Sequence, residues 1–278
     1  MFDFRYHVVS LAAVFLALVL GILVGVAISD PGLADRTDKQ NLRDEIARLE
    51  GQLEDAGARE RSDRAARAFA EDAYDVVMEG RLRGVDVGIL VVGEPDDAVV
   101  EHVANAITDA GGDVLRMRAL RVPLGDDLSD ELSPAELGRM LGEEFVAGGE
   151  APTWDDLSSE LVLERDGSLE LPADAVVIVR TVTPQREETA RMLRGLYDGV
   201  GGSVPAVGAE ASTTEPSAVE VWDDAGLSVV DDVDTAVGRV SLAVVLGGTS
   251  SGHFGVKDGA RALVPPIPLL TPPEDTGG

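Results

Sequence analysis

The side chains best suited to chemistry in this sequence are carboxylates that stand next to one another in pairs. Paired carboxylates can bind Ca²⁺ or divide general acid and base roles between them. The pairs fall in expected loops and helix starts, however, where aspartate commonly caps backbone N–H groups. Capping and solvation is therefore the favoured interpretation of these pairs, which are Asp96-Asp97, Asp126-Asp127, Asp155-Asp156, Asp223-Asp224 and Asp231-Asp232.

Other reactive residue types are sparse. The sequence has no cysteine, which excludes thiol catalysis and thiolate metal sites, and its three histidines are His7, His102 and His253. Copper favours clusters of methionine, histidine or cysteine, and no such cluster can be drawn. The loop Gly247–Gly252 begins like a phosphate-binding loop, but His253 and Phe254 stand where Lys and Ser/Thr are needed. We predict no catalytic or cofactor-binding residues and no enzyme, and the metal ligands are unknown.

The overall charge limits the partners. Fifty-one acidic residues oppose 23 basic ones, which gives a formal net charge of −28 over 278 residues. Such a surface repels phosphate backbones, so we expect no nucleic acid partner. A chain of this length has room for one sizeable domain in addition to extended elements.

One uncharged apolar run organises the chain. Val8 to Ile28 reads VVSLAAVFLALVLGILVGVAI, and about 20 apolar residues in a helix cross a hydrocarbon core of roughly 30 Å. Residues 1–30 are therefore expected to form a single membrane anchor. A cleaved signal peptide is the alternative, but the run is longer than the usual apolar region of one. Gly21 and Gly25 have the Gly-x-x-x-Gly spacing that lets two membrane helices pack closely.

Residues 31–83 are expected to form a helical stalk. Its proposed seam follows the alternating spacing of four and three residues that is typical of a coiled coil. The seam consists of Leu42, Ile46, Leu49, Leu53 and Ala56. This pattern predicts a homodimer or a coiled-coil protein partner. A stalk packed on itself or on the following domain is the competing interpretation.

Residues 84–264 alternate strand and helix patterns. The apolar runs Val85–Val92 and Asp174–Arg180 read as buried strands, and Asp97–Ala110 between them has a helical apolar stripe. Strands that alternate with helices predict a parallel sheet, so the expected fold class is α/β, with a Rossmann-like parallel-sheet domain. Residues 265–278 are rich in proline and glycine and are expected to form a flexible tail.

Two local features are less regular. Leu161–Leu171 holds Asp166-Gly167 between alternating residues and is expected to form a small hairpin. Asp234–Leu246 is expected to be a helix capped by Asp234, and the alternative is a strand in its apolar second half.

Two stretches carry a family resemblance. The opening FRYHVVSLAAVFLALVLGILVG, followed by an acidic coiled-coil segment, resembles the actinobacterial MctB family, named for mycobacterial copper transport. The C-terminal stretch resembles that family in its Gly-Arg helix, its Gly-x-x-Gly turn and its closing proline. These features are Gly238-Arg239, Gly252–Gly255 and Pro265.

This resemblance implies a cell-envelope protein with a role in copper homeostasis or efflux, and copper is implied by it alone. The family is described as forming outer-membrane channels, and its relatives include coiled-coil partners of cell-wall hydrolase regulators. Because the sequence offers one apolar helix and an α/β pattern, we expect a membrane-anchored binding or assembly component, not a self-contained pore. Most of the chain is expected outside the cytoplasm. The alternative is a scaffold that regulates cell-wall hydrolysis or septation through a protein partner.

Overall fold

The computed structural model describes residues 4–29, 36–94, 96–123, 132–180 and 186–268. The chain divides into two compact units, residues 1–67 and residues 68–278, and each unit is described here by itself. The expected boundaries after residues 30, 83 and 264 stay predictions.

The described residues of the first unit are all helical. Helix α1 runs from Phe4 to Ser29, and helix α2 begins at Arg36 and ends at Met78, so its last turns belong to the second unit. Most of the described apolar side chains of α1 are about half exposed or more, as Leu11 at 62% illustrates, while Leu23 is less exposed. Among the residues that the structure describes, no helix meets the requirements of length and apolarity for crossing a bilayer. The expected membrane-spanning helix is therefore not confirmed.

The second unit is built on a seven-stranded sheet in the order β3-β2-β1-β4-β5-β6-β7. All neighbouring strands are parallel except β2 and β3, which are antiparallel. The expectation of a mixed α/β domain with a mainly parallel sheet is confirmed. The narrower description as Rossmann-like stays a prediction. The strands are β1 (Asp86–Val92), β2 (Asp113–Leu120), β3 (Val162–Asp166), β4 (Ala175–Arg180), β5 (Ala206–Ala209), β6 (Ser228–Val230) and β7 (His253–Phe254).

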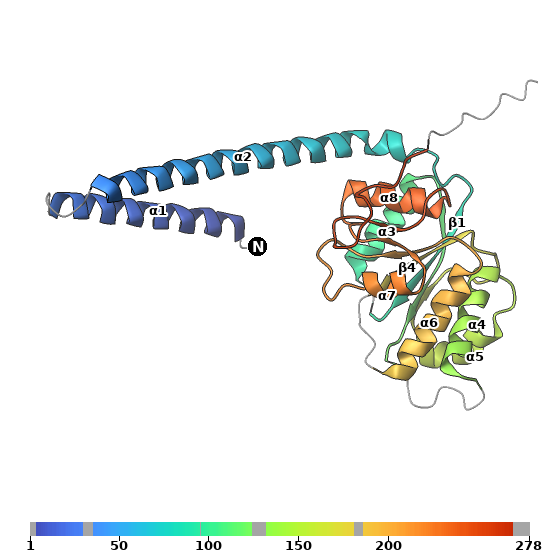
Figure 1. Cartoon of the computed structure of the whole chain (residues 1–278). Coiled ribbons are helices and arrows are strands. Elements are labelled where there is room, and N and C mark those ends of the chain that lie inside the picture. Colours follow the sequence, from blue (N-terminus) through green and yellow to red (C-terminus); the bar gives the residue numbers. More distant parts are fainter. Residues whose placement is uncertain (1–3, 30–35, 95, 124–131, 181–185, 269–278) are drawn as a thin grey trace, which may run out of the picture. The chain divides into compact units, whose positions relative to one another are not determined.

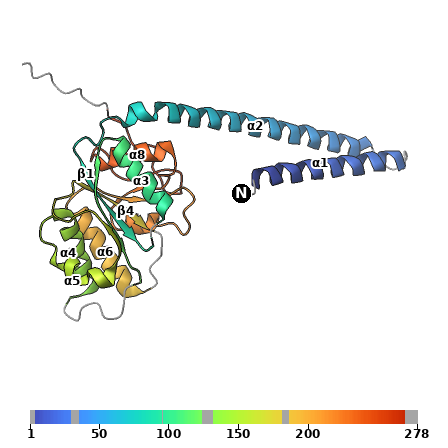
Figure 2. The ribbon, with the colours of Figure 1, turned by 180° about the vertical axis from the view of Figure 1, so that it is seen from behind.

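Helices cover both faces of this sheet (Figures 1 and 2). Helices α3 (Asp97–Asp109) and α8 (Ala236–Leu246) pack on one face, together with the last turn of α2. The other face carries α4 (Pro134–Ala147), α5 (Pro152–Leu161), α6 (Glu187–Gly201) and α7 (Val219–Asp224). Successive residues of β1 alternate between the two cores, as the period of two in a strand requires. Burial on both faces explains the nearly continuous apolar runs of these strands.

Two local predictions are wrong, and three short elements were not predicted. Residues 161–171 do not form a hairpin of their own, because β3 pairs with β2, with Arg165 opposite Arg118. The Asp166-Gly167 sequence, which is typical of a tight turn, suggested that the strand would pair with the residues directly after it. It pairs instead with the free edge of β2, which is a longer strand. Helix α8 is capped by Thr235, whose hydroxyl accepts from the Gly238 N–H, and not by Asp234. Helices α5 and α7 and strand β7 were not predicted, since each is short.

Glycines allow α4 and α6 to approach closely. A Cβ at Gly138 would lie 1.9 Å from the Met192 carbonyl oxygen, and one at Gly195 would lie 1.9 Å from the Ala135 carbonyl oxygen. Both are far below contact distance, so only glycine fits at these crossing points. Gly142 and Gly199 repeat the arrangement one turn later, which gives each helix a Gly-x-x-x-Gly pair.

The C-terminal end of α2 is fixed to the α/β unit. Met78 is fully buried, and the Tyr74 hydroxyl donates to the Asp109 carboxylate over 2.7 Å. The Arg239 guanidinium lies 5.0 Å from the centre of the Tyr74 ring and donates to its hydroxyl over 3.3 Å. The Arg of the Gly238-Arg239 motif therefore joins α8 to the end of α2. Residues 269–278 of the expected tail lie outside the described residues.

Candidate functional site

The strand order places a crevice at one edge of the sheet. The chain passes from β1 outward to β2 and then returns to the other side of β1 to form β4. Helices that follow β1 and β4 therefore leave the sheet on opposite faces. In open α/β sheets, ligands bind in the crevice outside the carboxyl ends of the strands at such a reversal. Functional side chains are therefore expected after β1, β4 and β5.

A polar cleft of about 260 Å³ occupies this edge. The Asp96 side chain at its rim accepts from the Ala98 and Val99 N–H groups and so caps α3. This bond confirms the interpretation of Asp96 as a capping residue. The cleft is lined by Asp96, Val99, Val179, Arg180, Ala209, Glu210, Ala211, Thr213, Thr214 and Glu215.

Arg180 is the last residue of β4 and is only 6% exposed. Burial lowers the pKa of its guanidinium from the ordinary value, because a charged group loses hydration there. The same side chain also lines a second pocket, between α6 and α7. Arg180 therefore brings a positive charge to two hollows at the carboxyl end of the sheet.

A buried ion pair closes one side of the cleft. The Lys257 ammonium lies 2.5 Å from the Glu210 carboxylate and also donates to the Thr214 carbonyl over 2.9 Å. Glu210 follows β5, is 1% exposed, and accepts further bonds from the Ser217 hydroxyl and the Ala218 N–H. The two Lys257 contacts join the C-terminal segment to the segment after β5, and the two other Glu210 contacts lie within that segment. The pair thus has a structural role at the wall of the cleft.

A second buried pair lies beside it. The His253 Nε2 atom is 2.5 Å from the Asp231 carboxylate, and both side chains are buried. Asp231 also accepts from the Val256 and Lys257 N–H groups. Gly255 has φ +135°, and a Cβ there would lie 2.2 Å from the Asp231 carboxylate. The Gly-x-x-Gly turn of the family pattern is therefore the backbone that wraps around Asp231.

Asp232 stands apart from these pairs. Its Oδ2 atom accepts from the Thr235 hydroxyl over 3.1 Å, but its buried Oδ1 atom has no hydrogen-bond partner. Burial, reinforced by the neighbouring Asp231 and Asp234 carboxylates, raises its pKa from 3.8 to about 6. The interpretation of the Asp231-Asp232 pair as solvated is wrong, since both are buried, whereas Asp231 does accept from backbone N–H groups as expected. Asp126-Asp127 lies outside the described residues.

Within the described ranges, no group of three or more His, Asp or Glu side chains is arranged to hold a metal ion. Asp231 and His253 bring a carboxylate and an imidazole together, as in a metal site. The Asp231 carboxylate, however, already accepts hydrogen bonds from two backbone N–H groups.

The residues of the proposed coiled-coil seam and of the membrane-helix glycine pair all lie in the first unit. They are far along the sequence from the strands that form the cleft. Ile46, Leu49, Leu53 and Ala56 lie on α2 and are exposed, with Leu53 at 66%. Leu42 is within α2, but its side chain lies outside the described part. A Cβ added at Gly21 or Gly25 of α1 would meet nothing within 4 Å. The seam and the glycine pair stay predictions.

Sequence reasoning missed the residues that form the cleft. Arg180 ends the run DAVVIVR, and an arginine directly after a buried parallel strand lies at the carboxyl edge of its sheet. The position of Arg180 in the sequence could therefore have identified it as a candidate cleft residue. Lys257 could also have been singled out, because Lys39 and Lys257 are the lysines of this acidic chain. Glu210 carried no comparable signal, since its burial follows from tertiary packing.

The fold and the cleft at the carboxyl edge of the sheet define a class of protein. It is an open α/β domain with a mainly parallel sheet and a polar cleft where the strand order reverses, preceded in the chain by two helices. Comparison with known families is more specific. The family model described as "Copper transport outer membrane protein, MctB" matches residues 1–143 and 124–265. The chain belongs to this MctB family, and the resemblance inferred from its two ends is confirmed.

Curated relatives agree with the family match. Proteins named "Copper transporter MctB" from Mycobacterium tuberculosis and Mycobacterium bovis are 27% identical over 323 aligned positions, covering 95% of this chain and 99% of each relative. The protein of that name from Mycobacterium leprae is 26% identical over 319 positions, with 96% and 100% coverage. Their names denote transport and not an enzyme class. The similarity thus extends over nearly the full length of this chain and of each relative.

Proposed function

We propose that this protein is a membrane-anchored component of the cell envelope that acts in copper homeostasis or efflux. The observation that carries this proposal is the family match, which extends over nearly the entire chain and agrees with relatives named as copper transporters. The protein acts as a binding or assembly component: its α/β unit presents a cleft of about 260 Å³ to a ligand or partner. The comparisons name no role in cell-wall hydrolysis, and no described feature favours that alternative.

The anchor is α1. Its described side chains form an apolar surface that is exposed along the helix, as Val14 and Phe15 show, and an apolar surface of this extent favours contact with lipid or another protein. Bilayer insertion removes these side chains from water and leaves the bulk of the chain in the aqueous phase outside the cytoplasm. Detergent partitioning tests this step: the full chain is expected in the detergent phase, and a variant without residues 1–30 in the aqueous phase. Aqueous partitioning of the full chain would contradict the anchor.

The partner is a second copy, joined along α2. Ile46, Leu49 and Leu53 keep heptad spacing and are 39 to 66% exposed, so a paired helix would bury them. The exposed Glu45–Arg48 and Glu60–Arg64 pairs lie on the same helix and keep it soluble outside the seam. Replacing Leu49 and Leu53 together by aspartate is expected to convert a dimer to a monomer in analytical ultracentrifugation. Replacing the exposed Glu50 and Glu54 by glutamine is the matched control and leaves the dimer intact.

Copper measurements in cells test the role itself. Deletion of the gene is expected to change the cell-associated copper content and copper tolerance, while zinc content stays constant. The full chain restores the copper phenotype, and the variant without residues 1–30 does not. A deletion strain with normal copper content and tolerance, in cells that make detectable amounts of the wild-type protein, would refute the proposed role.

A further inference from the structure

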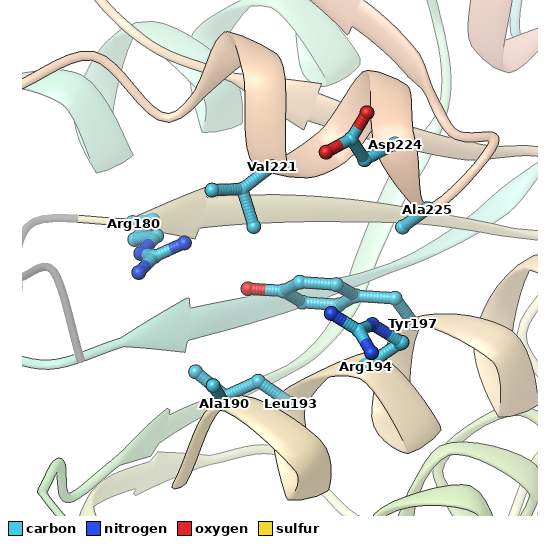
Figure 3. A pocket seen from close by; sticks show the side chains of 8 residues that line it. All are labelled: Arg180, Ala190, Leu193, Arg194, Tyr197, Val221, Asp224 and Ala225. Carbon is cyan, nitrogen blue, oxygen red and sulfur yellow. The ribbon is translucent and has the colours of Figure 1, made fainter. Parts of the chain in front are cut away.

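A second pocket lies on the other side of Arg180, between α6 and α7 (Figure 3). It has a volume of about 230 Å³. Helix α6 contributes one wall, and the end of β4 contributes Arg180. The opposite wall comes from α7 and the residue after it. The lining residues are Arg180, Ala190, Leu193, Arg194, Tyr197, Val221, Asp224 and Ala225.

The charges of this pocket are unusual for the chain. Two guanidinium groups, Arg180 and Arg194, approach the hollow in a protein whose formal net charge is −28. Asp224 on α7 is a carboxylate among the described lining residues. Guanidinium groups therefore outnumber carboxylates in the described lining, which favours an anionic ligand. Carboxylates match guanidinium geometry well and form strong charge-assisted hydrogen bonds with it.

Tyr197 adds a second, independent observation. Its side chain is 1% exposed, and Arg180 and Trp222 face its hydroxyl oxygen as donors, whereas the O–H proton has no acceptor among the described residues. The hydroxyl points toward Arg180 (Figure 3). Guanidinium and indole groups can only donate, so the Tyr197 O–H lacks an acceptor. Burial raises the pKa of Tyr197 to about 12, which keeps this proton in place.

The remaining walls are apolar. Ala190 and Leu193 of α6 face Val221 and Ala225 across the hollow in Figure 3. These aliphatic groups offer no hydrogen bonds and favour a short hydrocarbon chain over water. A ligand for this pocket therefore has an acceptor group at one end and an apolar body at the other.

We propose that this pocket binds a small organic monoanion, a carboxylate with a short aliphatic chain. The carboxylate contacts Arg180 and Arg194 and supplies the acceptor that the Tyr197 hydroxyl lacks, while the chain lies against Leu193 and Val221. Tyr197 serves as a positioning residue for the carboxylate. This binding is independent of copper, so it stands or falls separately from the proposed role in copper homeostasis.

Titration of the full chain in detergent micelles with butyrate tests the proposal, by calorimetry and by Trp222 fluorescence. Saturable butyrate binding is expected, together with no binding of butanamide, which has the same shape without the charge. Acetate is expected to bind more weakly than butyrate, because it leaves the apolar walls uncovered. Equal binding of butyrate and butanamide, tighter binding of inorganic phosphate, or no butyrate binding would each overturn the proposal.

Variants locate the binding. Arg194 is exposed, so Arg194→Gln keeps the fold and is expected to weaken butyrate binding at least about tenfold through loss of a charge-assisted bond. Arg191→Gln, an exposed position on the same helix outside the lining, is the matched control and leaves binding unchanged. Tyr197→Phe removes a buried hydroxyl whose proton has no acceptor among the described residues, so it changes the thermal midpoint little and weakens butyrate binding severalfold. Unchanged butyrate affinity in both Arg194→Gln and Tyr197→Phe would contradict the assignment.

Discussion

The same glycine spacing occurs in two regions with opposite surroundings. Gly138 and Gly195 lie where α4 and α6 cross, and a Cβ at either would lie 1.9 Å from a backbone oxygen of the other helix. Gly21 and Gly25 of α1 have the same Gly-x-x-x-Gly spacing, but added Cβ atoms would meet nothing within 4 Å. The spacing thus permits a close helix crossing, whereas the presence of a packed partner decides whether one forms.

The contrast extends to the apolar side chains of the two units. In residues 68–278, leucines such as Leu82, Leu141 and Leu196 are fully buried in one of two cores. In residues 1–67, Leu49 is 46% and Leu53 is 66% exposed. The α/β unit buries most of its own apolar surface, while most of the described apolar side chains of the helical unit are exposed.

Ion pairs offer the sharpest test of this contrast. Lys257→Met leaves Glu210, which is 1% exposed, without its counter-charge and is expected to destabilise the α/β unit by about 3–5 kcal/mol. The matched change Arg64→Met breaks the Glu60–Arg64 pair, whose side chains are more than 70% exposed. Water solvates Glu60 there, so no measurable change in stability is expected. Urea denaturation of both variants, followed by circular dichroism, which reports the helices of both units, measures the difference. Similar small losses in both variants would remove the distinction between the units.

Glycine substitutions give the next largest effect. Gly195→Ala forces a methyl group against the Ala135 carbonyl, so α4 and α6 must separate, at a cost of about 2–3 kcal/mol. Gly51→Ala on α2 meets nothing within 4 Å and raises helix propensity, which stabilises the helix by about 0.5–1 kcal/mol. Circular dichroism during urea unfolding reports both changes. The comparison fails if Gly195→Ala is as stable as the wild-type chain.

A pH-dependent effect of intermediate size is expected at Asp232. Its pKa is about 6 in the folded chain and 3.8 in the reference state, so folding favours the protonated form. The contribution of Asp232 to stability is therefore fully present below about pH 4 and is lost as the pH rises through 6. Asp232→Asn removes this dependence and is expected to stabilise the α/β unit by about 2 kcal/mol at pH 7.5, with little gain at pH 4.

The measurement is the difference in unfolding free energy between the wild-type chain and Asp232→Asn at the two pH values. Asp234→Asn is the control, because Asp234 is partly exposed and accepts hydrogen bonds from the Ser212 N–H and hydroxyl. A gain for Asp232→Asn that is equal at both pH values would show that the buried charge is not its cause.

The sequence was informative where periodicity was strong. The runs that became β1 and β4, the amphipathic helix α3 and the Ser133 cap of α4 could all be predicted, because each depends on nearby residues. Strand β3 could not, since the choice between a local hairpin and the edge of β2 is made by partners about 50 residues away. The parallel order of β4 to β7 follows from repeated helix crossovers.

The candidate site was much less predictable. Glu210, Lys257, Asp231 and His253 become neighbours because β5, β6 and β7 end at one edge, which no sequence spacing encodes. The family pattern did include Gly238, Arg239 and Gly255, and the structure supplies their physical reasons. Gly238 packs against the Asp232 carbonyl, Gly255 wraps around Asp231, and Arg239 contacts Tyr74.

The smallest expected effect concerns the single helix that enters both units. Tyr74→Phe removes the hydrogen bonds to Asp109 and from Arg239 but keeps the ring, so a loss of about 1 kcal/mol is expected. The loss should appear as faster amide hydrogen exchange over residues 68–78, whose protection depends on packing against the α/β unit. Exchange over residues 45–60 should be unchanged, because that part of α2 has no contact with Tyr74. Faster exchange along the whole helix would instead mean that α2 opens as one cooperative element, and the contrast between the two units would then not divide it.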